Sequence, residues 1–346
     1  MSRPDFGIVL CAGLGTRLSP LTDTLPKPLL SFLDQPIVRY MVDALLDHDV
    51  DTLGFNAHAH ADRLQQWVRE FTPRTERRLA PRLSVRREPV LAGTGGGASG
   101  VWEHMGRPAG TCLVVNGDIV CDLPVTTLMQ VHRRTGAAVT MMTLPPIPGE
   151  VPLWVDESRH FIVRVPGERD EVWSANHRSG TGAPVSFGGV YVMDATVLAS
   201  LPEGKSCLVR NGVAPLLQAG ATIASCPFPG FWADLGTASR FLSATEQILE
   251  RPELLQLAGL PVRSNHVWQR ETRRVHPTAR LEGPVLVAAG ATVNAGAVVG
   301  PGAVIGAGCV VEEGAVVRHA VLMNGAHARG VVERQVCSGA AALRSV

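Results

Sequence analysis

Short apolar runs alternate with amphipathic stretches through the first part of the chain. The apolar runs have the length and composition of buried strands, and they cover residues 8–10, 52–57, 83–87, 113–115 and 137–144. Between them, residues 36–48 and 62–71 carry apolar side chains at helical spacing. This alternation predicts an α/β fold with a doubly wound, mostly parallel sheet, whose ligand site lies at the carboxyl ends of the strands.

The pattern continues less regularly towards residue 255. Residues 93–97 are rich in glycine and predict a loop, followed by a helix over 98–105. Residues 145–185 are rich in turn-forming residues and favour no regular element. A strand is predicted over 186–193, and a helix over 238–249 closes this part of the chain.

The end of the chain repeats every six residues. Aliphatic side chains recur at this spacing, and glycines recur at the same spacing in a second register. The aliphatic positions are Val287, Val293, Val299, Ile305, Val311 and Val317, and the glycines are Gly290, Gly296, Gly302, Gly308 and Gly314. This period is typical of a hexapeptide parallel β-helix, and such solenoids resemble left-handed β-helices. We therefore expect a first domain over residues 1–255, a linker over 256–275 and a short left-handed β-helix over 276–346.

Composition narrows the class of protein. A chain of 346 residues with 45% hydrophobic residues is long enough for two domains. Its net charge of +1 does not favour binding to nucleic acid or to a membrane surface. We expect no membrane span and no secretion signal, and therefore a cytoplasmic location. The seven cysteines are scattered without a CxxC pair, which predicts free thiols and no zinc site.

The candidate chemistry begins in residues 7–30. The strand at 8–10 runs into the small-residue loop Ala12-Gly13-Leu14-Gly15-Thr16, which Arg17 follows; Lys27 comes ten residues later, between two prolines. Free backbone N–H groups in such a loop, together with two cations, predict a phosphate site. The P-loop pattern and the dinucleotide fingerprint both fit badly, because no Lys-Ser or Lys-Thr follows the glycines and position 18 is leucine.

The motif G-L-G-T-R-L-x-P-L-T-x-x-x-P-K-P-L resembles the signature of the sugar-1-phosphate nucleotidylyltransferases, or NDP-sugar pyrophosphorylases. The resemblance covers roughly residues 5–250 and the hexapeptide tail, and it implies a Rossmann-like nucleotidyltransferase domain. It implies attack by a sugar-1-phosphate oxygen on the α-phosphate of a nucleoside triphosphate, with release of pyrophosphate. The loop would bind the nucleotide through Leu10, Ala12, Gly13, Gly15, Thr16 and Arg17. Arg17, Lys27 and Asp118 would be the catalytic residues.

Two aspartates are the candidate metal ligands. Asp118 follows a buried strand, where an Asx turn is the alternative, and Asn116-Gly117-Asp118 is similar to the family's metal-binding motif. Asp234 could simply cap the following helix, but Trp232-x-Asp234-x-Gly236-Thr237 resembles the family's closing motif. The resemblance implies that the two carboxylates share a Mg²⁺ ion, which takes one or two carboxylates plus phosphate oxygens.

Substrate recognition involves further candidates. Glu88 with Gly93 and Thr94 resembles the family's base-reading loop, and a carboxylate there could accept from guanine or uracil. The alternative for Glu88 is an exposed acid paired with Arg86 or Arg87. The resemblance implies that the sugar phosphate is bound by Lys27, Asn116, Gly189 and Arg164.

Two of these acceptor-side candidates, Gly189 and Arg164, depend on further observations about the sequence. Gly189 could instead mark a bulge in its strand. The family's middle Glu-Lys-Pro is replaced here by Arg164-Val165-Pro166, so the usual lysine is absent and Arg164 is its candidate substitute.

Several functions remain open. The main expectation is an enzyme that joins GTP to mannose 1-phosphate or to a related hexose or heptose phosphate. One alternative is a UTP-dependent hexosamine- or muramate-1-phosphate uridylyltransferase. A second is a non-catalytic subunit that binds an NDP-sugar. A third is an added acyltransferase in the β-helix, where His319 and His327 are available. The β-helix could also mediate formation of a homo-oligomer.

Overall fold

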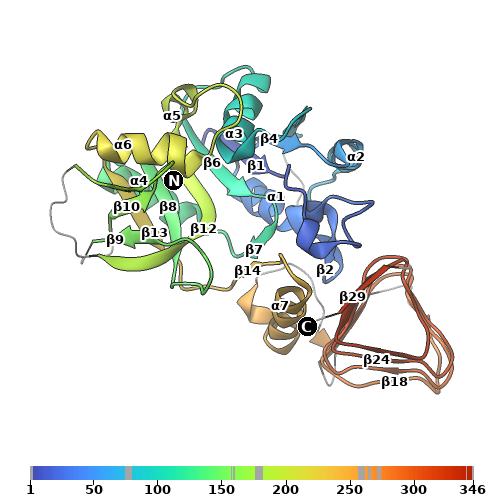
Figure 1. Ribbon diagram of the computed structural model, residues 1–346. Coiled ribbons are helices and arrows are strands. Elements are labelled where there is room, and N and C mark those ends of the chain that lie inside the picture. Colours follow the sequence, from blue (N-terminus) through green and yellow to red (C-terminus); the bar gives the residue numbers. More distant parts are fainter. Residues whose placement is uncertain are drawn as a thin grey trace. The chain divides into compact units, whose positions relative to one another are not determined.

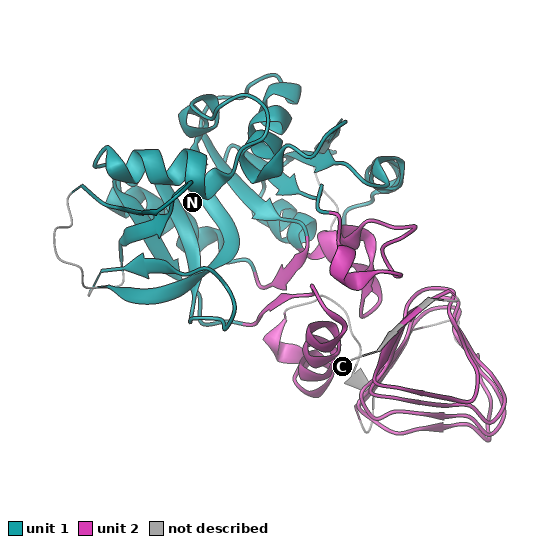
Figure 2. Cartoon of the chain, viewed as in Figure 1, with its two compact units in different colours: residues 1–13, 41–117, 123–230 teal, residues 14–40, 118–122, 231–346 magenta. Residues whose placement is uncertain are grey.

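The computed structural model describes residues 3–74, 80–156, 158, 160–175, 182–255, 262–263, 266–270, 274–339 and 341–344. The chain divides into two compact units (Figure 2). The first unit contains residues 1–13, 41–117 and 123–230, and the second contains residues 14–40, 118–122 and 231–346. The domain boundaries expected from the sequence remain predictions, and residues 256–261, 264–265 and 271–273 of the expected linker lie outside the described residues.

The first unit is built on a ten-stranded sheet with a parallel part and an antiparallel part (Figure 1). The parallel part has the order β5-β4-β1-β6, and β12 joins β6 in the antiparallel direction. The strands are β1 (Phe6–Leu10), β4 (Thr52–Ala57), β5 (Arg82–Arg87), β6 (Thr111–Asn116), β8 (Val139–Leu144), β9 (Leu153–Val155), β10 (Ile162–Pro166), β11 (Glu171–Trp173), β12 (Ala183–Asp194) and β13 (Ile223–Pro227). The structure confirms the predicted α/β class.

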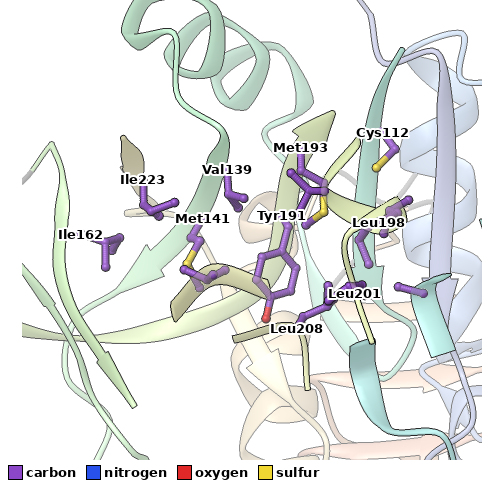
Figure 3. Close-up of a cluster of buried hydrophobic side chains, with 14 of the residues drawn as sticks. Cys112, Val139, Met141, Ile162, Tyr191, Met193, Leu198, Leu201, Leu208 and Ile223 are labelled. Atoms are coloured by element: carbon purple, nitrogen blue, oxygen red, sulfur yellow. The ribbon is translucent and has the colours of Figure 1, made fainter. Parts of the chain in front are cut away.

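Helices accompany this sheet and bury a large apolar core. Figure 3 shows part of that core, where Tyr191 and Met193 of β12 lie among side chains of β8 and of the segment 198–208. The helices are α1 (Ile37–Asp47), α2 (Ala61–Glu70), α3 (Gly93–His104), α4 (Val125–Thr135), α5 (Ala195–Ala199), α6 (Ala214–Gln218) and the π-helix η3 (Leu208–Val213). Among the described residues, no helix has both the length and the apolar composition needed to cross a membrane.

The glycine-rich stretch is helical, so the predicted helix start at residue 98 is wrong. Helix α3 begins at Gly93. Glycine is a poor helix former, but here its missing Cβ leaves room for neighbouring backbone. A Cβ on Gly93 would lie 2.4 Å from the carbonyl oxygen of Ser206, and one on Gly96 would lie 2.0 Å from that of Gly204. The glycines therefore let residues 204–206 pack directly against α3.

The second unit contains the predicted β-helix. Its strands form three sheets, with parallel pairing from one coil to the next, as expected for a left-handed parallel β-helix (Figure 1). The three sets are β16 (Val267–Gln269), β19 (Val285–Val287), β22 (Ala303–Ile305), β25 (Val321–Leu322) and β28 (Gln335–Ser338); β17 (Arg274–Val275), β20 (Thr292–Val293), β23 (Val310–Val311) and β26 (His327–Ala328); and β18 (Arg280–Leu281), β21 (Val298–Val299), β24 (Val316–Arg318) and β27 (Val331–Glu333). Short β15 (Val262–Arg263) and β29 (Ala341–Arg344) pair antiparallel to β16 and β28 at the two ends.

The β-helix continues beyond the point at which the sequence period fails. Val287 pairs with Ile305, 18 residues later, which is three hexapeptides per coil. The next coils are shorter, because Ile305 pairs with Leu322 and Val317 pairs with Val332. The five predicted turn glycines all have φ between +66° and +69°, a region that disfavours residues with a Cβ. The period therefore predicted the coil correctly, and the coil continues with shorter turns after the period ends.

A smaller part of the second unit connects distant segments of the chain. It consists of β2 (Ser31–Phe32), β3 (Gln35–Pro36), β7 (Ile119–Cys121), β14 (Trp232–Asp234), α7 (Ala238–Glu250) and the short 3₁₀ turns η1 (Thr16–Leu18), η2 (Lys27–Leu29) and η4 (Pro252–Leu254). Phe32 packs edge-on against Tyr40 of α1 and against Phe241 of α7. Strands β7 and β14 pair antiparallel, with Asp234 opposite Ile119.

Candidate active site

Lys27 lies between the two predicted metal-binding aspartates. Its Nζ is 2.8 Å from Asp118 Oδ2 and 2.8 Å from Asp234 Oδ1. The lysine side chain is only 6% exposed, whereas those of Asp118 and Asp234 are 38% and 18% exposed. All three residues belong to the second unit. Residues predicted from three separate motifs therefore form one charged cluster.

Local structure explains how these three side chains meet. Lys27 starts the turn η2, where Pro26 and Pro28 restrict the backbone on both sides. Asp118 directly precedes β7, and Asp234 is the last residue of β14. Because Asp234 is paired with Ile119, the neighbour of Asp118, the antiparallel register brings the two carboxylates to the same end of the two strands.

Two arginines lie beside Asp234. Arg240 Nη1 donates to Asp234 Oδ2 at 2.7 Å, and Arg17 Nη2 lies 3.8 Å from the same oxygen. Gly236 leaves the space for this arrangement, since a Cβ there would lie 2.7 Å from Arg17 Nη2 and 2.9 Å from Asp234 Oδ2. Thr237, not Asp234, caps helix α7 by accepting from the backbone N–H of Arg240. The helix-cap alternative for Asp234 is therefore wrong.

The electrostatic environment keeps Asp234 ionised. Burial alone would raise its pKa, but Lys27, Arg240 and Arg17 together outweigh burial and hold the pKa of Asp234 below its usual value. The group of three cations and two carboxylates has a formal net charge of +1. The cluster is therefore a place where additional negative charge, such as phosphate, would be stabilised.

A second set of hydrogen bonds lies at the carboxyl ends of β1, β4 and β5 in the first unit. Asn56, 3% exposed, accepts from the backbone N–H of Cys11 at 2.6 Å and donates to Glu88 Oε1 at 2.9 Å. The other oxygen of Glu88 accepts from the backbone N–H of Ala92 at 3.0 Å. His58 Nδ1 lies 2.8 Å from the backbone carbonyl of Glu88. These hydrogen bonds connect the residues at the carboxyl ends of three parallel strands and fix their positions relative to one another.

Glu88 is not the exposed acid that one alternative expected. Its side chain is 2% exposed, and Arg86 Nη1 lies 3.7 Å from Oε1, whereas Arg87 pairs with Asp62. Gly97 of α3 makes room for the group, because a Cβ there would lie 2.6 Å from Asn56 Nδ2. The hydroxyl of Thr94, another predicted nucleotide contact, accepts from the backbone N–H of Leu208, and Gly93 has φ +70°.

The comparisons with known proteins agree with these features. Residues 6–150 match the model of the Nucleotidyl transferase family. The matched part of this chain is therefore similar to a nucleotidyl transferase domain. This match confirms the resemblance that the first motif indicated, and the predicted nucleotide loop, Lys27, Glu88 and Asp118 all fall within the matched residues.

Similar curated proteins have names that specify a nucleotide and a sugar phosphate. The chain is 26% identical over 237 residues to the mannose-1-phosphate guanylyltransferase catalytic subunit beta of Xenopus tropicalis, covering 68% of this chain and 62% of the relative. It is 24% identical over 294 residues to a UTP–glucose-1-phosphate uridylyltransferase of Synechocystis, covering 81% and 73%. The chain thus spans less than two thirds of the first of these relatives.

A solved structure shares the fold. The crystal structure of HddC from Yersinia pseudotuberculosis, complexed with GMP-PN, matches with a TM-score of 0.53 and 19% identity. The match covers 70% of this chain and 98% of HddC. At this identity the likeness bears on the fold alone.

The predicted nucleotide loop leaves β1 and enters the turn η1. Gly15 has φ +64°, and its carbonyl accepts from the hydroxyl of Thr22 at 3.1 Å. Gly117 donates its backbone N–H to the carbonyl of Leu10 at 2.8 Å, so the end of β6 is tied to the end of β1. Ala12 is buried, whereas Gly13 and Thr16 are exposed.

The predicted sugar-phosphate residues of the first unit are Arg164, Gly189 and Asn116. Arg164 lies with its guanidinium carbon 3.5 Å from the ring centre of Trp154 and 4.6 Å from that of Trp173, and it pairs with Glu171. Val165, at the position of the family lysine, is buried in the core. Gly189 has φ +80° where the pairing of β12 with β8 shifts register, so the bulge alternative is observed. Asn116 ends β6, opposite Leu10.

Asn56 and Arg240 were not selected from the sequence as site residues. Asn56 is a polar residue near the end of a buried strand, and a polar residue at such a position indicates a side chain that forms hydrogen bonds there. Arg240 had no comparable signal, because its contact with Asp234 depends on the turn over Gly236 and Thr237.

Among the described residues, no group of three or more His, Cys, Asp or Glu side chains could hold a metal ion. Asp118 and Asp234 supply two carboxylates around a buried cation, which fits an ion that takes its remaining ligands from phosphate and water.

Proposed function

We propose that this protein transfers a nucleotidyl group from a nucleoside triphosphate to a sugar 1-phosphate. The observation that carries the proposal is the contact of Lys27 with both Asp118 and Asp234, with Arg17 beside them. The Nucleotidyl transferase match and the names of the curated relatives support the same reaction. An enzyme is favoured over a non-catalytic subunit because the charged residues of the cluster are all present.

In the proposed reaction, an oxygen of the sugar phosphate attacks the α-phosphorus of the nucleotide. The new P–O bond gives the NDP-sugar, the bond between the α-phosphorus and the bridging oxygen breaks, and pyrophosphate leaves with that oxygen. Two anions must approach each other, so positioning and charge neutralisation supply most of the catalysis. Lys27 and Arg17 are the residues assigned to neutralise phosphate charge.

Asp118 and Asp234 are the residues assigned to hold Mg²⁺. When bound, the ion would neutralise phosphate charge and fix the geometry of the reacting groups. Lys27 already contacts one oxygen of each carboxylate. The lysine therefore shows that a cation is accommodated between these two side chains.

GTP and mannose 1-phosphate are the proposed substrates, because guanylyltransferases recur among the similar proteins from Xenopus, Dictyostelium and Hypocrea. A uridylyltransferase is also similar to this chain at nearly the same identity, so UTP with a hexose phosphate is the second candidate. For the nucleobase we propose the segment 88–94. Both carboxylate oxygens of Glu88 are bonded within the protein, so Glu88 would order this segment, and backbone groups would read the base.

Pyrophosphate release tests the proposal. The purified protein is given Mg²⁺ and each of GTP, UTP, dTTP, CTP and ATP, crossed with a panel of hexose 1-phosphates. We expect one pair to exceed the others, and we expect Asp118→Asn to abolish its turnover. Binding of a nucleotide without turnover of any pair would overturn the enzymatic function and favour the regulatory one.

A further inference from the structure

Arg240 is the residue of the charged cluster that no motif indicated. It lies in the first turn of α7, and its Nη1 donates to Asp234 Oδ2 at 2.7 Å. Its side chain is 38% exposed, but the carboxylate that it contacts is 18% exposed. Such a charge-assisted hydrogen bond to a half-buried acid is stronger than a contact on an open surface.

The two oxygens of Asp234 have different partners. Oδ1 accepts from Lys27, which also contacts Asp118, whereas Oδ2 accepts from Arg240 and faces Arg17 at 3.8 Å. Lys27 therefore lies between the carboxylates, and Arg240 binds the opposite oxygen of one of them. A cation that takes the place of Lys27 between the two carboxylates would leave the contact of Arg240 with Asp234 Oδ2 in place.

The position of Arg240 is fixed by its helix. Thr237 Oγ1 accepts from the backbone N–H of Arg240 at 3.3 Å, which caps α7 at its start. The next residue, Phe241, is fully buried and packs edge-on against Phe32 at 5.7 Å between ring centres. The backbone of Arg240 is thus anchored on both sides, and its side chain remains beside Asp234.

The net charge of this cluster determines whether it attracts a cation or an anion more strongly. Arg17, Lys27 and Arg240 carry three positive charges, and Asp118 and Asp234 carry two negative ones. A free divalent cation would enter a region that is already positive, whereas a polyphosphate would be attracted. Arg240 contributes one of the charges that cause this preference, and it does so without occupying the position between the carboxylates.

We propose that Arg240 sets the order of binding at this site, by making the cluster accept polyphosphate before it accepts a free divalent ion. This inference rests on the proposed function, because it assigns the metal to Asp118 and Asp234. The metal then enters together with the nucleotide. Arg240 acts through Asp234 and through its charge, so it is a positioning residue and not a catalytic one.

The test measures binding without turnover. Mn²⁺ is titrated into the nucleotide-free protein and the free ion is followed by electron paramagnetic resonance, for the wild type and for Arg240→Gln, Arg240→Lys and Arg251→Gln. Arg251 is an exposed arginine that follows the last residue of α7, so its variant removes an equal charge elsewhere. Inorganic tripolyphosphate is titrated in parallel, without metal.

We expect Arg240→Gln to bind Mn²⁺ more tightly than the wild type, by about tenfold or more, since a like charge a few ångströms away is removed. Arg240→Lys and Arg251→Gln should remain within about twofold of the wild type, the size of effect expected for a distant exposed charge. Tripolyphosphate should bind the wild type without metal and should bind Arg240→Gln less tightly. A merely structural role for Arg240 would lower thermal stability but would not tighten Mn²⁺ binding.

Two results would overturn this inference. One is equal Mn²⁺ affinity in the wild type and Arg240→Gln; the other is a wild type that binds Mn²⁺ tightly without nucleotide but does not bind tripolyphosphate. If Arg240→Gln does not fold, Arg240→Met, which removes the charge but keeps a long side chain, takes its place in both titrations. Failure of the proposed function would be seen separately, as an absence of turnover in the wild type.

Discussion

Lys27 Nζ donates a hydrogen bond of 2.8 Å to Asp234 Oδ1, although 207 positions separate the two residues in the chain. The turn that carries Lys27 and the strand that carries Asp234 are both short, and neither would be stable alone. The contact joins the first motif of the chain to the motif around Asp234. Both motifs therefore contribute side chains to one charged cluster.

Replacement of Lys27 by alanine should abolish most of the activity. The variant loses the ammonium group that neutralises phosphate, and it leaves Asp118 and Asp234 without the cation between them. We expect turnover to fall by about 100-fold or more, the scale found when one electrostatic contact to a reacting group is removed. Initial rates of pyrophosphate release with the best substrate pair provide the measurement.

The chain supplies its own control for this variant. It contains only two lysines, and the other, Lys205, is exposed. Lys205→Ala should retain wild-type turnover. Equal activity of Lys27→Ala and Lys205→Ala would contradict the role assigned to Lys27.

Replacement of Glu88 by glutamine should destabilise the protein without changing the preferred base. The two carboxylate oxygens of Glu88 accept hydrogen bonds from Asn56 Nδ2 and from the backbone N–H of Ala92. In the glutamine variant, an NH₂ group replaces one of these oxygens, so two hydrogen-bond donors would face each other. A buried donor without an acceptor costs about 1–3 kcal/mol. Denaturant unfolding measures the loss of stability, and KM values for GTP and UTP measure selectivity.

Glu103 is a suitable control for Glu88, since it is exposed and pairs with Arg107 on the surface of α3. Glu103→Gln should change neither stability nor KM appreciably. If Glu88→Gln remained as stable as the wild type and reversed the preference between GTP and UTP, the carboxylate itself would read the base.

The elements that the sequence predicted well are those with a strong local pattern. The strand over 52–57 has the predicted bounds, and the six-residue repeat located the β-helix coil up to Val317, because an inward aliphatic and a turn glycine are both local requirements. Helix α3 was predicted to start too late, since the glycines that favour a loop by propensity are explained only by the approach of Gly204 and Ser206. That approach is a tertiary contact.

The residues of the candidate site differ in the same respect, because only those within a local sequence motif were predicted. Lys27, Asp118 and Asp234 were found because each lies in a recognisable motif. Arg240 and Asn56 were missed, since their roles depend on partners that a turn or a neighbouring strand supplies. The antiparallel strands β9, β10 and β11 lie in the turn-rich region, whose short runs carry too few residues for a clear period.

Native protein should expose a single reactive thiol. All seven cysteines are free; six are buried, and Cys207 is half-buried. Burial raises the pKa of the Cys226 and Cys309 thiols to about 11, and it also raises the pKa of Cys112, Cys121 and Cys337. Since only the thiolate reacts, these groups should be inert at neutral pH.

Reaction with a chromogenic disulfide reagent tests this expectation. We expect one fast equivalent in the native protein, its loss in Cys207→Ser, and seven equivalents after unfolding in guanidinium chloride. Several fast equivalents from the folded protein would show that the buried segments open readily. A fast equivalent that persists in Cys207→Ser would show that a different thiol is exposed.

Arg164 should matter for stability more than for binding of the sugar phosphate. Its guanidinium lies between Trp154 and Trp173 and pairs with Glu171, so its charge is already engaged within the protein. Arg164→Ala removes a cation–π contact of roughly 0.5–2 kcal/mol together with the packing of both rings. We expect a lower melting temperature and a KM for sugar phosphate within about twofold of the wild type, because a group held elsewhere contributes little to ground-state binding.

Arg164→Lys keeps the charge but loses the planar group, so it should be destabilised as well. A large rise in the KM of Arg164→Ala that Arg164→Lys restores would instead show that Arg164 replaces the missing family lysine.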